Sequence, residues 1–141
     1  MKAIVFAIMA SLVWGMAPPI FKLVLKAGIP PSVALIFHNL AAFSAALLIT
    51  FLLGEKMVYS PKHFLFAMLG GVMSGFLGLY LFFLALKRGD VSVVSPIASI
   101  SPLWSAIFAH LALGEGLSPV RVLGIILVIA GASLLMVSLQ R

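Results

Sequence analysis

The chain is built from apolar runs of about 20 residues that short polar or Gly/Pro-containing connections separate. The runs cover approximately residues 3–25, 33–53, 64–86, 91–113 and 120–139. A bilayer core of roughly 30 Å needs about 20 apolar residues in one helix, so each run is long enough to cross it. Strands of a membrane barrel would be about 10 residues long with alternating polarity. We therefore predict an all-α, polytopic membrane bundle of five transmembrane helices, forming one domain over residues 1–141.

The composition indicates that most of the chain's surface faces lipid rather than water. The chain is 64% hydrophobic and 9% charged, with a mean hydropathy of +1.30, whereas a soluble domain has about a quarter of its residues charged. The first run continues past Ala17 to Leu25, too long for the apolar part of a signal peptide, so we interpret it as a retained span. These features exclude a soluble domain and a soluble enzyme.

The charged residues point to lipid as a partner. The formal net charge is +6, but the basic residues are scattered singly or in pairs, which favours lipid headgroups over nucleic acid. Cysteine is absent, which excludes disulfides, thiolate metal sites and a cysteine nucleophile. We expect no cofactor, no metal site and no nucleic-acid partner.

The basic residues divide almost evenly between the two membrane faces. With five spans, one face holds Lys2, Lys56, Lys62 and Arg121, and the other holds Lys22, Lys26, Lys87, Arg88 and Arg141. Proteins with one orientation usually carry a cytoplasmic excess of Lys and Arg. Nearly equal numbers of Lys and Arg on the two faces are expected if the chain inserts in both orientations or if a partner sets its topology. They can also arise by chance, because the count is small.

The third span has glycines at helical spacing. The pattern Gly71-x-x-x-Gly75 predicts close packing of this span against another helix, and Gly124 and Gly131 allow the same for the fifth. Glycine is also simply common in membrane helices, which is the alternative reading.

The fourth span combines serines with prolines. On an ideal helix, Ser92, Ser95, Ser99 and His110 fall within about 60° of one face. Each proline of this span removes an amide donor, and a kink frees backbone carbonyls that are tolerated beside a cavity. Pro96 and Pro102 therefore predict a kinked wall that lines a solute path. Serines that bond back to their own helix are the equally weighted alternative.

The first span has a similar polar stripe that includes Ser11 and Lys22. Pro18 and Pro19 should break or bend this helix near its middle. Lys22 could attract anions in a vestibule or extend to the headgroups. Trp14 is too deep for an interfacial residue, so it contacts substrate, closes a gate or packs in the core.

Ionisable and hydroxyl groups at membrane depth are further candidates. His38, His110 and Tyr80 either line the path or make helix-end and packing contacts. The acids Glu55, Asp90 and Glu115 all lie in connections, so no carboxylate is available inside the membrane to bind a proton or a cationic drug. Glu115 could instead cap the fifth span or pair with Arg121.

Over residues 80–135 the chain carries a family pattern, consisting of Ala85-Leu86-Lys87, Ser92-Val93-Val94-Ser95-Pro96, Ser101-Pro102-Leu103, Leu113-Gly114-Glu115, Leu117-Ser118, Gly124 and Gly131. In order and spacing it resembles the second half of the repeat in EamA-type carriers of the drug/metabolite transporter superfamily. Trp14-Gly15 and Ile29-Pro30-Pro31 agree more loosely. The resemblance implies export or exchange of small metabolites or drugs.

The chain departs from that family pattern in two ways. Members usually carry two five-helix repeats related by inversion, and this chain has one. His38 stands where many members have an arginine, which puts an anion-binding role for that position in doubt.

The sequence thus predicts a transporter and not an enzyme. We expect alternating access for a small-molecule solute, in the cell (inner) membrane, by an antiparallel homodimer or paralogue heterodimer. A lipid-carrier flippase or accessory membrane subunit is the alternative. An intramembrane hydrolase with His38 or His110 as base is less favoured, because no carboxylate at membrane depth would orient the histidine.

Overall fold

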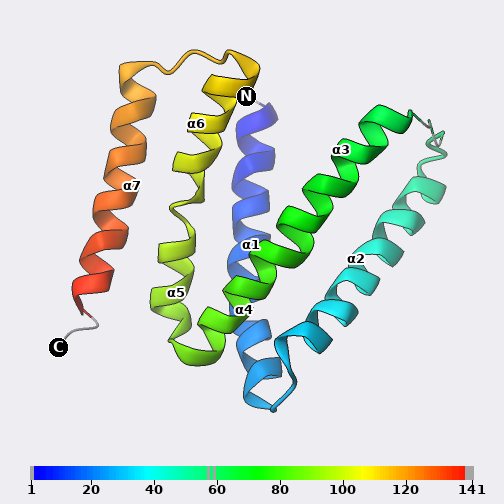
Figure 1. The fold of residues 1–141 in the computed structure, drawn as a ribbon, viewed down its shortest axis with the longest axis horizontal. Helices are drawn as coiled ribbons and strands as arrows, with labels where there is room; N and C mark the ends of the chain where they lie inside the picture. The colour runs from blue at the N-terminus through cyan, green and yellow to red at the C-terminus, as the bar shows by residue number, and fades with distance from the viewer. Residues whose placement is uncertain (1, 57, 59, 139–141) are drawn as a thin grey trace. The chain divides into compact units, whose positions relative to one another are not determined.

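The computed structural model describes residues 2–56, 58 and 60–138, and these form helices without a strand (Figure 1). The elements are α1 (Lys2–Lys26), α2 (Pro31–Leu52), α3 (Pro61–Gly71), the π-helix η1 (Val72–Gly78), α4 (Leu79–Arg88), α5 (Val91–Ala98), α6 (Ser101–Leu113) and α7 (Pro119–Ser138). The predicted all-α class is confirmed. The predicted end of the fifth span at residue 139, and Arg141 in the charge count, lie outside the described residues.

The helical segments match a membrane in length and polarity. Among the described residues, four segments are long and apolar enough to cross one, namely Lys2–Lys26, Pro31–Leu52, Pro61–Arg88 and Val91–Leu113. A shorter apolar stretch, Pro119–Leu134, lies in α7. Four to five helices of this chain can therefore span a bilayer.

Glycine and proline set the helix boundaries. Gly28 has a φ of 85°, a conformation that side chains resist, and it ends α1 two residues before Pro30. Pro31 then begins α2 at a position where a missing N–H costs no helical hydrogen bond. Gly114, with a φ of 68°, ends α6 in the same way as Gly28 ends α1.

The prolines of the first span leave its helix continuous. α1 runs uninterrupted through Pro18 and Pro19, so the helix is not broken there, and a bend stays a prediction. The two prolines remove the donors for the carbonyls of Trp14 and Gly15, but a proline φ near −65° is itself helical. Pro18 is buried, so its ring is packed rather than exposed to lipid.

The chain divides into two compact units, Met1–Arg88 and Gly89–Arg141. In the first, α1 and α2 both pack on α4, and the fully buried side chains are Leu35, Phe83 and Leu86. In the second, α5 packs against α7, and Val93 and Ala132 are buried. A single domain over residues 1–141 stays a prediction.

Most of the large apolar side chains are exposed, including Trp14, Leu52 and Leu111. In water such a surface would drive aggregation. The helices thus present apolar surface to lipid or to another protein chain, as expected for a membrane protein whose own core is small.

The third apolar run contains a π-helical segment at its glycines. Within η1, a Cβ on Gly78 would lie 3.1 Å from the carbonyl oxygen of Met73, so this wide turn fits glycine best. π-helical turns widen the helix by one residue per turn and occur often at functional sites. The sequence predicted one regular helix here, because its apolar pattern carries no sign of the wider turn.

A polar contact joins α2 to this π-helix. The Asn39 side-chain amide donates a hydrogen bond of 3.1 Å to the Gly75 carbonyl, and a Cβ on Gly75 would lie 3.2 Å from Asn39 Oδ1. Of the two glycines in the predicted packing motif, Gly75 therefore makes the close approach, and its partner is α2. Gly71 has open space around it.

We predict that Asn39→Ala and Gly75→Ala each lower the free energy of unfolding by about 1 kcal/mol, the scale of hydrogen bonds between membrane helices. Asn39→Ala removes the donor, and the Cβ of Gly75→Ala would crowd Asn39 Oδ1 and displace the same side chain, so the two effects should not add in a double-mutant cycle. Gly71→Ala is the matched control and should cost nothing, because no atom lies within 4 Å of the added Cβ. Reversible unfolding in mixed micelles measures these differences. Additive effects would show that the contact does not couple the helices.

Candidate functional site

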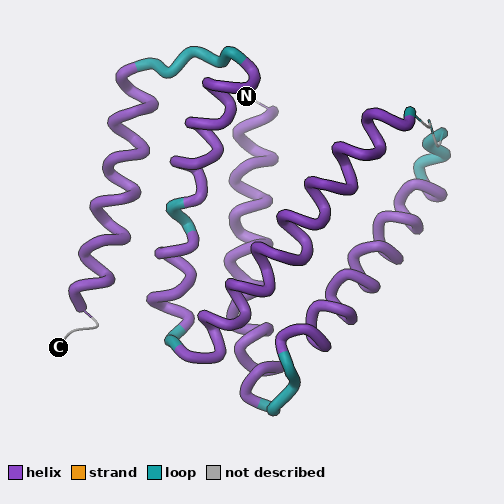
Figure 2. The backbone as a smooth tube through the Cα atoms, in the orientation of Figure 1, coloured by secondary structure: helices purple, strands orange, loops and turns teal. Residues whose placement is uncertain are grey.

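The fourth apolar run is interrupted between α5 and α6, at Ser99 and Ile100 (Figure 2). Pro102 has no N–H to bond the carbonyl of Ala98, so one helical hydrogen bond is missing at this point and the helix is weakened there. The amide of Ser99 bonds the carbonyls of Ser95 at 3.0 Å and Pro96 at 3.1 Å, which closes the last turn of α5. Pro102 is then the second residue of α6, where proline is tolerated.

A cavity of about 460 Å³ lies beside this interruption, within the second unit. It is lined by residues of α5 and α7 and the cap of α5, namely Ser95, Pro96, Ser99, Leu127, Val128, Gly131 and Ala132. None of these side chains is charged. The cavity therefore suits an uncharged, partly apolar group with few hydrogen-bonding atoms.

The two serines of this cavity differ in their bonding. Ser99 Oγ donates to the Ser95 carbonyl at 2.9 Å, so it bonds back to its own helix. Ser95 Oγ is buried and has no hydrogen-bond partner among the described residues. A buried hydroxyl without a partner costs about 1–3 kcal/mol. Ser95 is therefore the group in this cavity that gains most from a polar ligand.

The other two members of the predicted polar face do not line this cavity. Ser92 is exposed. His110 lies near the end of α6, where its Nδ1 donates to the main-chain carbonyl of Glu115 at 2.8 Å. The ideal-helix alignment placed all four residues on one face, but the interruption at Ser99 and Ile100 breaks the helical register between them. Ser95 and Ser99 remain together.

Arg121 and Glu115 do not form the ion pair that the sequence suggested as one role for Glu115. The Arg121 guanidinium donates to the Gly116 carbonyl at 2.9 Å, and its main-chain amide faces Ser118 Oγ at 3.4 Å. Ser118, rather than Glu115, thus supplies the side-chain cap near the start of α7.

In the first unit, Lys22 bonds the end of a neighbouring helix. Its Nζ donates to the Leu86 carbonyl at 2.5 Å and is partly buried. Leu86 lies in the last turn of α4, whose carbonyls have no amide partner within the helix. A cation there also interacts favourably with the negative end of the helix dipole. Lys22 thus stabilises a helix terminus, a role the sequence did not reveal.

The aromatic candidates of the first unit lie in different settings. The half-buried His38 ring contacts Phe21 edge-on, with centroids 5.4 Å apart. Tyr80 stacks on Phe76 at 5.8 Å. Trp14 is 74% exposed, and Ser11 bonds back to the Ile8 carbonyl at 2.8 Å. The roles predicted for these four residues in a solute path stay predictions.

Sequence reasoning missed two polar contacts of the first unit, those of Asn39 and of Lys22. Both side chains reach carbonyls of the third run, Gly75 and Leu86, more than 30 residues away in the sequence. The position of Asn39 within an apolar run could have predicted its contact, because an amide side chain at membrane depth needs a hydrogen-bond partner. Among the described residues, no three His, Asp or Glu side chains gather into a metal-binding group.

The fold and this cavity define a class: an α-helical, polytopic membrane protein with an interrupted helix beside an uncharged cavity. Comparison with known proteins gives the family. The EamA-like transporter family matches residues 1–137, so the chain belongs to the EamA-like transporter family, a family of membrane transporters.

Two relatives illustrate the likeness. The chain is 42% identical over 76 residues to a Sinorhizobium sp. protein described as an uncharacterized transporter in the cobO 3′ region, covering 54% of this chain and 53% of that protein. The match thus spans about half the length of that relative. An uncharacterized protein of Methanocaldococcus jannaschii is 26% identical over 136 residues, covering 96% of this chain and 97% of that protein. No solved structure matches the chain.

Proposed function

We propose that the chain moves a small, uncharged solute across the cell (inner) membrane by alternating access, with the Ser95 cavity as part of the solute path. The observation that carries this proposal is the buried, unpartnered Ser95 hydroxyl beside an interrupted helix. Transporters commonly build substrate sites at broken helices, because freed backbone groups can bind solute there.

The lining of the cavity selects the chemistry of the solute. Leu127, Val128 and Ala132 offer apolar contact, and Ser95 offers a hydroxyl that both donates and accepts. A charged group would find no counter-ion among the residues that line this cavity. The solute should therefore present an apolar portion with a hydroxyl or carbonyl group to this wall.

The functional unit that we propose is an antiparallel pair, either a homodimer or a heterodimer with a paralogue. Two features support it: the nearly even division of basic residues between the two faces, and the extensive apolar surface that the helices leave exposed. Two oppositely inserted copies would reproduce the inverted repeats on which alternating access depends in related architectures.

The solute site is tested by ligand-dependent thermal stabilisation of the purified protein with a panel of small metabolites. A compound that binds the folded state raises its melting temperature by mass action. For a stabilising compound, Ser95→Ala should weaken binding about tenfold, because one buried hydrogen bond is lost.

The matched control is Ser133→Ala in α7, because Ser133 is exposed and bonds back to the Ile129 carbonyl. It should leave affinity unchanged. If Ser95→Ala and the unaltered protein bind every stabilising compound with equal affinity, Ser95 is not part of the binding site. Liposomes that scramble a lipid probe but move no soluble metabolite would favour the flippase alternative.

The antiparallel pair predicts two orientations in the membrane. A topology reporter fused after residue 141 should register on both faces in comparable amounts when the chain is expressed alone. Adding three lysines to the connection between α2 and α3 should drive the population toward one orientation, with that connection cytoplasmic. A single orientation of the unaltered chain, in cells without an oppositely oriented paralogue, would contradict the homodimer.

A further inference from the structure

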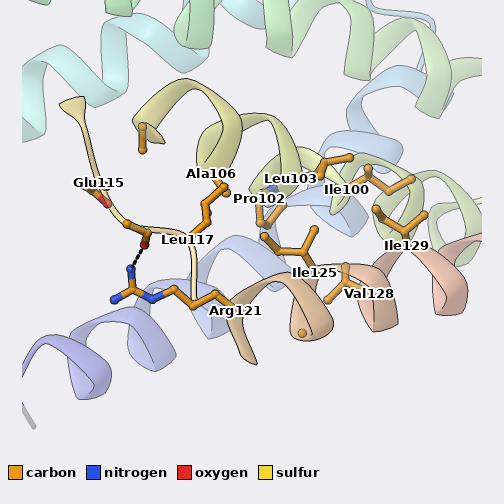
Figure 3. A pocket seen from close by; sticks show the side chains of 13 residues that line it. Ile100, Pro102, Leu103, Ala106, Glu115, Leu117, Arg121, Ile125, Val128 and Ile129 are labelled. Atoms are coloured by element: carbon orange, nitrogen blue, oxygen red, sulfur yellow. Dashed lines mark hydrogen bonds between the residues drawn. The ribbon is translucent and has the colours of Figure 1, made fainter. Parts of the chain in front are cut away.

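A second cavity, of about 450 Å³, lies between α6 and α7 within the second unit (Figure 3). Residues of both helices and of their connection line it: Ile100, Pro102, Leu103, Ala106, Ala109, Glu115, Gly116, Leu117, Arg121, Gly124, Ile125, Val128 and Ile129. Only Val128 is shared with the Ser95 cavity. The lining is apolar along the helices and charged at the end formed by the connection.

The apolar part of this cavity is a slot that follows the helices. On α7 its lining residues recur at helical spacing, from Gly124 and Ile125 to Val128 and Ile129. Ile125 points toward the side chains contributed by α6 in Figure 3. At 1.5 Å per residue, the distance along α7 from Arg121 to Ile129 is about 12 Å. A slot of this shape accepts an extended hydrocarbon chain.

The charged end of the slot carries one acid and one base. Glu115 and Arg121 are both exposed and lie at the same end of the cavity (Figure 3). In the described part of the chain, the Arg121 guanidinium bonds only the Gly116 carbonyl, which leaves most of its five N–H donors for another acceptor. No cation of the described residues lies within ion-pair distance of the Glu115 carboxylate. Two opposite charges thus flank the slot without neutralising each other.

We propose that this cavity binds a glycerophospholipid whose headgroup carries both a phosphate and a primary ammonium, as in phosphatidylethanolamine. One acyl chain occupies the slot between α6 and α7. The Arg121 guanidinium binds the phosphate through charge-assisted hydrogen bonds, and the Glu115 carboxylate binds the ammonium.

The placement of the charges supports a lipid as the occupant. Glu115 lies in the connection between α6 and α7, and Arg121 lies in the first turn of α7. With both helices spanning a bilayer, these residues would lie at the depth of the headgroups and the slot would run from there toward the bilayer core. A phosphate alone would be repelled by Glu115, and an ammonium alone by Arg121. A zwitterionic headgroup matches both.

The acyl slot is tested with Gly124→Leu. No atom lies within 4 Å of a Cβ at Gly124, which lines the cavity, so we expect a leucine there to extend into the slot and take the place of the acyl chain. Gly70→Leu is the matched control, because Gly70 is also helical with open space around it. Native mass spectrometry of the delipidated protein measures binding of phosphatidylethanolamine, phosphatidylglycerol and phosphatidylcholine. Gly124→Leu should weaken all three at least about tenfold, and Gly70→Leu should change none.

The headgroup contacts are tested with two charge variants that leave the slot intact. Arg121→Gln should weaken all three lipids about tenfold, because each carries a phosphate. With Glu115 bound to the ammonium, the unaltered protein should bind phosphatidylethanolamine more tightly than phosphatidylglycerol. Glu115→Gln should weaken phosphatidylethanolamine and strengthen phosphatidylglycerol, which removes this preference. Each variant changes a solvent-exposed side chain, so these arms remain informative if Gly124→Leu fails to fold.

Unchanged lipid affinity of Gly124→Leu would overturn the proposal. An unchanged preference in Glu115→Gln would overturn the assignment of the ammonium. If Gly124→Leu instead separates a dimer and leaves lipid binding intact, the cavity is an interface between copies and the proposal is wrong. None of these outcomes depends on solute transport, so the lipid site and the proposed function are tested separately.

Discussion

The structure depends on one constraint: inside a bilayer, backbone N–H and C=O groups must find partners within the protein. Nearly all the described membrane-depth backbone is therefore helical. Only a few positions depart from the regular α-helix, notably η1 and the interruption before Pro102. At each departure backbone groups find partners: the Asn39 side chain bonds the Gly75 carbonyl, and the Ser99 amide bonds the carbonyls of Ser95 and Pro96.

The same constraint explains how this chain uses its polar side chains. Lys22 and Asn39 donate to carbonyls of the neighbouring α4 and η1, while Ser11 and Ser99 bond back to their own helices. The Lys22 and Asn39 bonds join neighbouring helices, and the Ser11 and Ser99 bonds satisfy the hydroxyl donors within one helix. Ser95 is the exception, since its buried hydroxyl has no partner in the described part of the chain. That difference, rather than polarity alone, is why we propose Ser95 as part of the solute path.

Sequence reasoning recovered the features that local chemistry determines. Gly28, Pro31 and Gly114 set helix boundaries through backbone geometry, and the apolar runs gave the helical class and membrane setting. It could not find the π-helix, because the pattern of apolar and polar residues in a glycine-rich run does not distinguish π-helical from α-helical hydrogen bonding. It also could not place Lys22, whose partner is a backbone carbonyl 64 residues away. The polar face of the fourth run was predicted on an ideal helix, and the interruption separates His110 from Ser95.

The central claim is that Ser95 faces a water-accessible solute path, and cysteine accessibility tests it most directly. The chain has no cysteine, so Ser95→Cys provides a single thiol, and Leu134→Cys on the exposed apolar surface of α7 is the control. In membrane vesicles, a small, uncharged, water-soluble thiol reagent should label Ser95→Cys and spare Leu134→Cys. Equal resistance of both cysteines to the reagent would contradict the account.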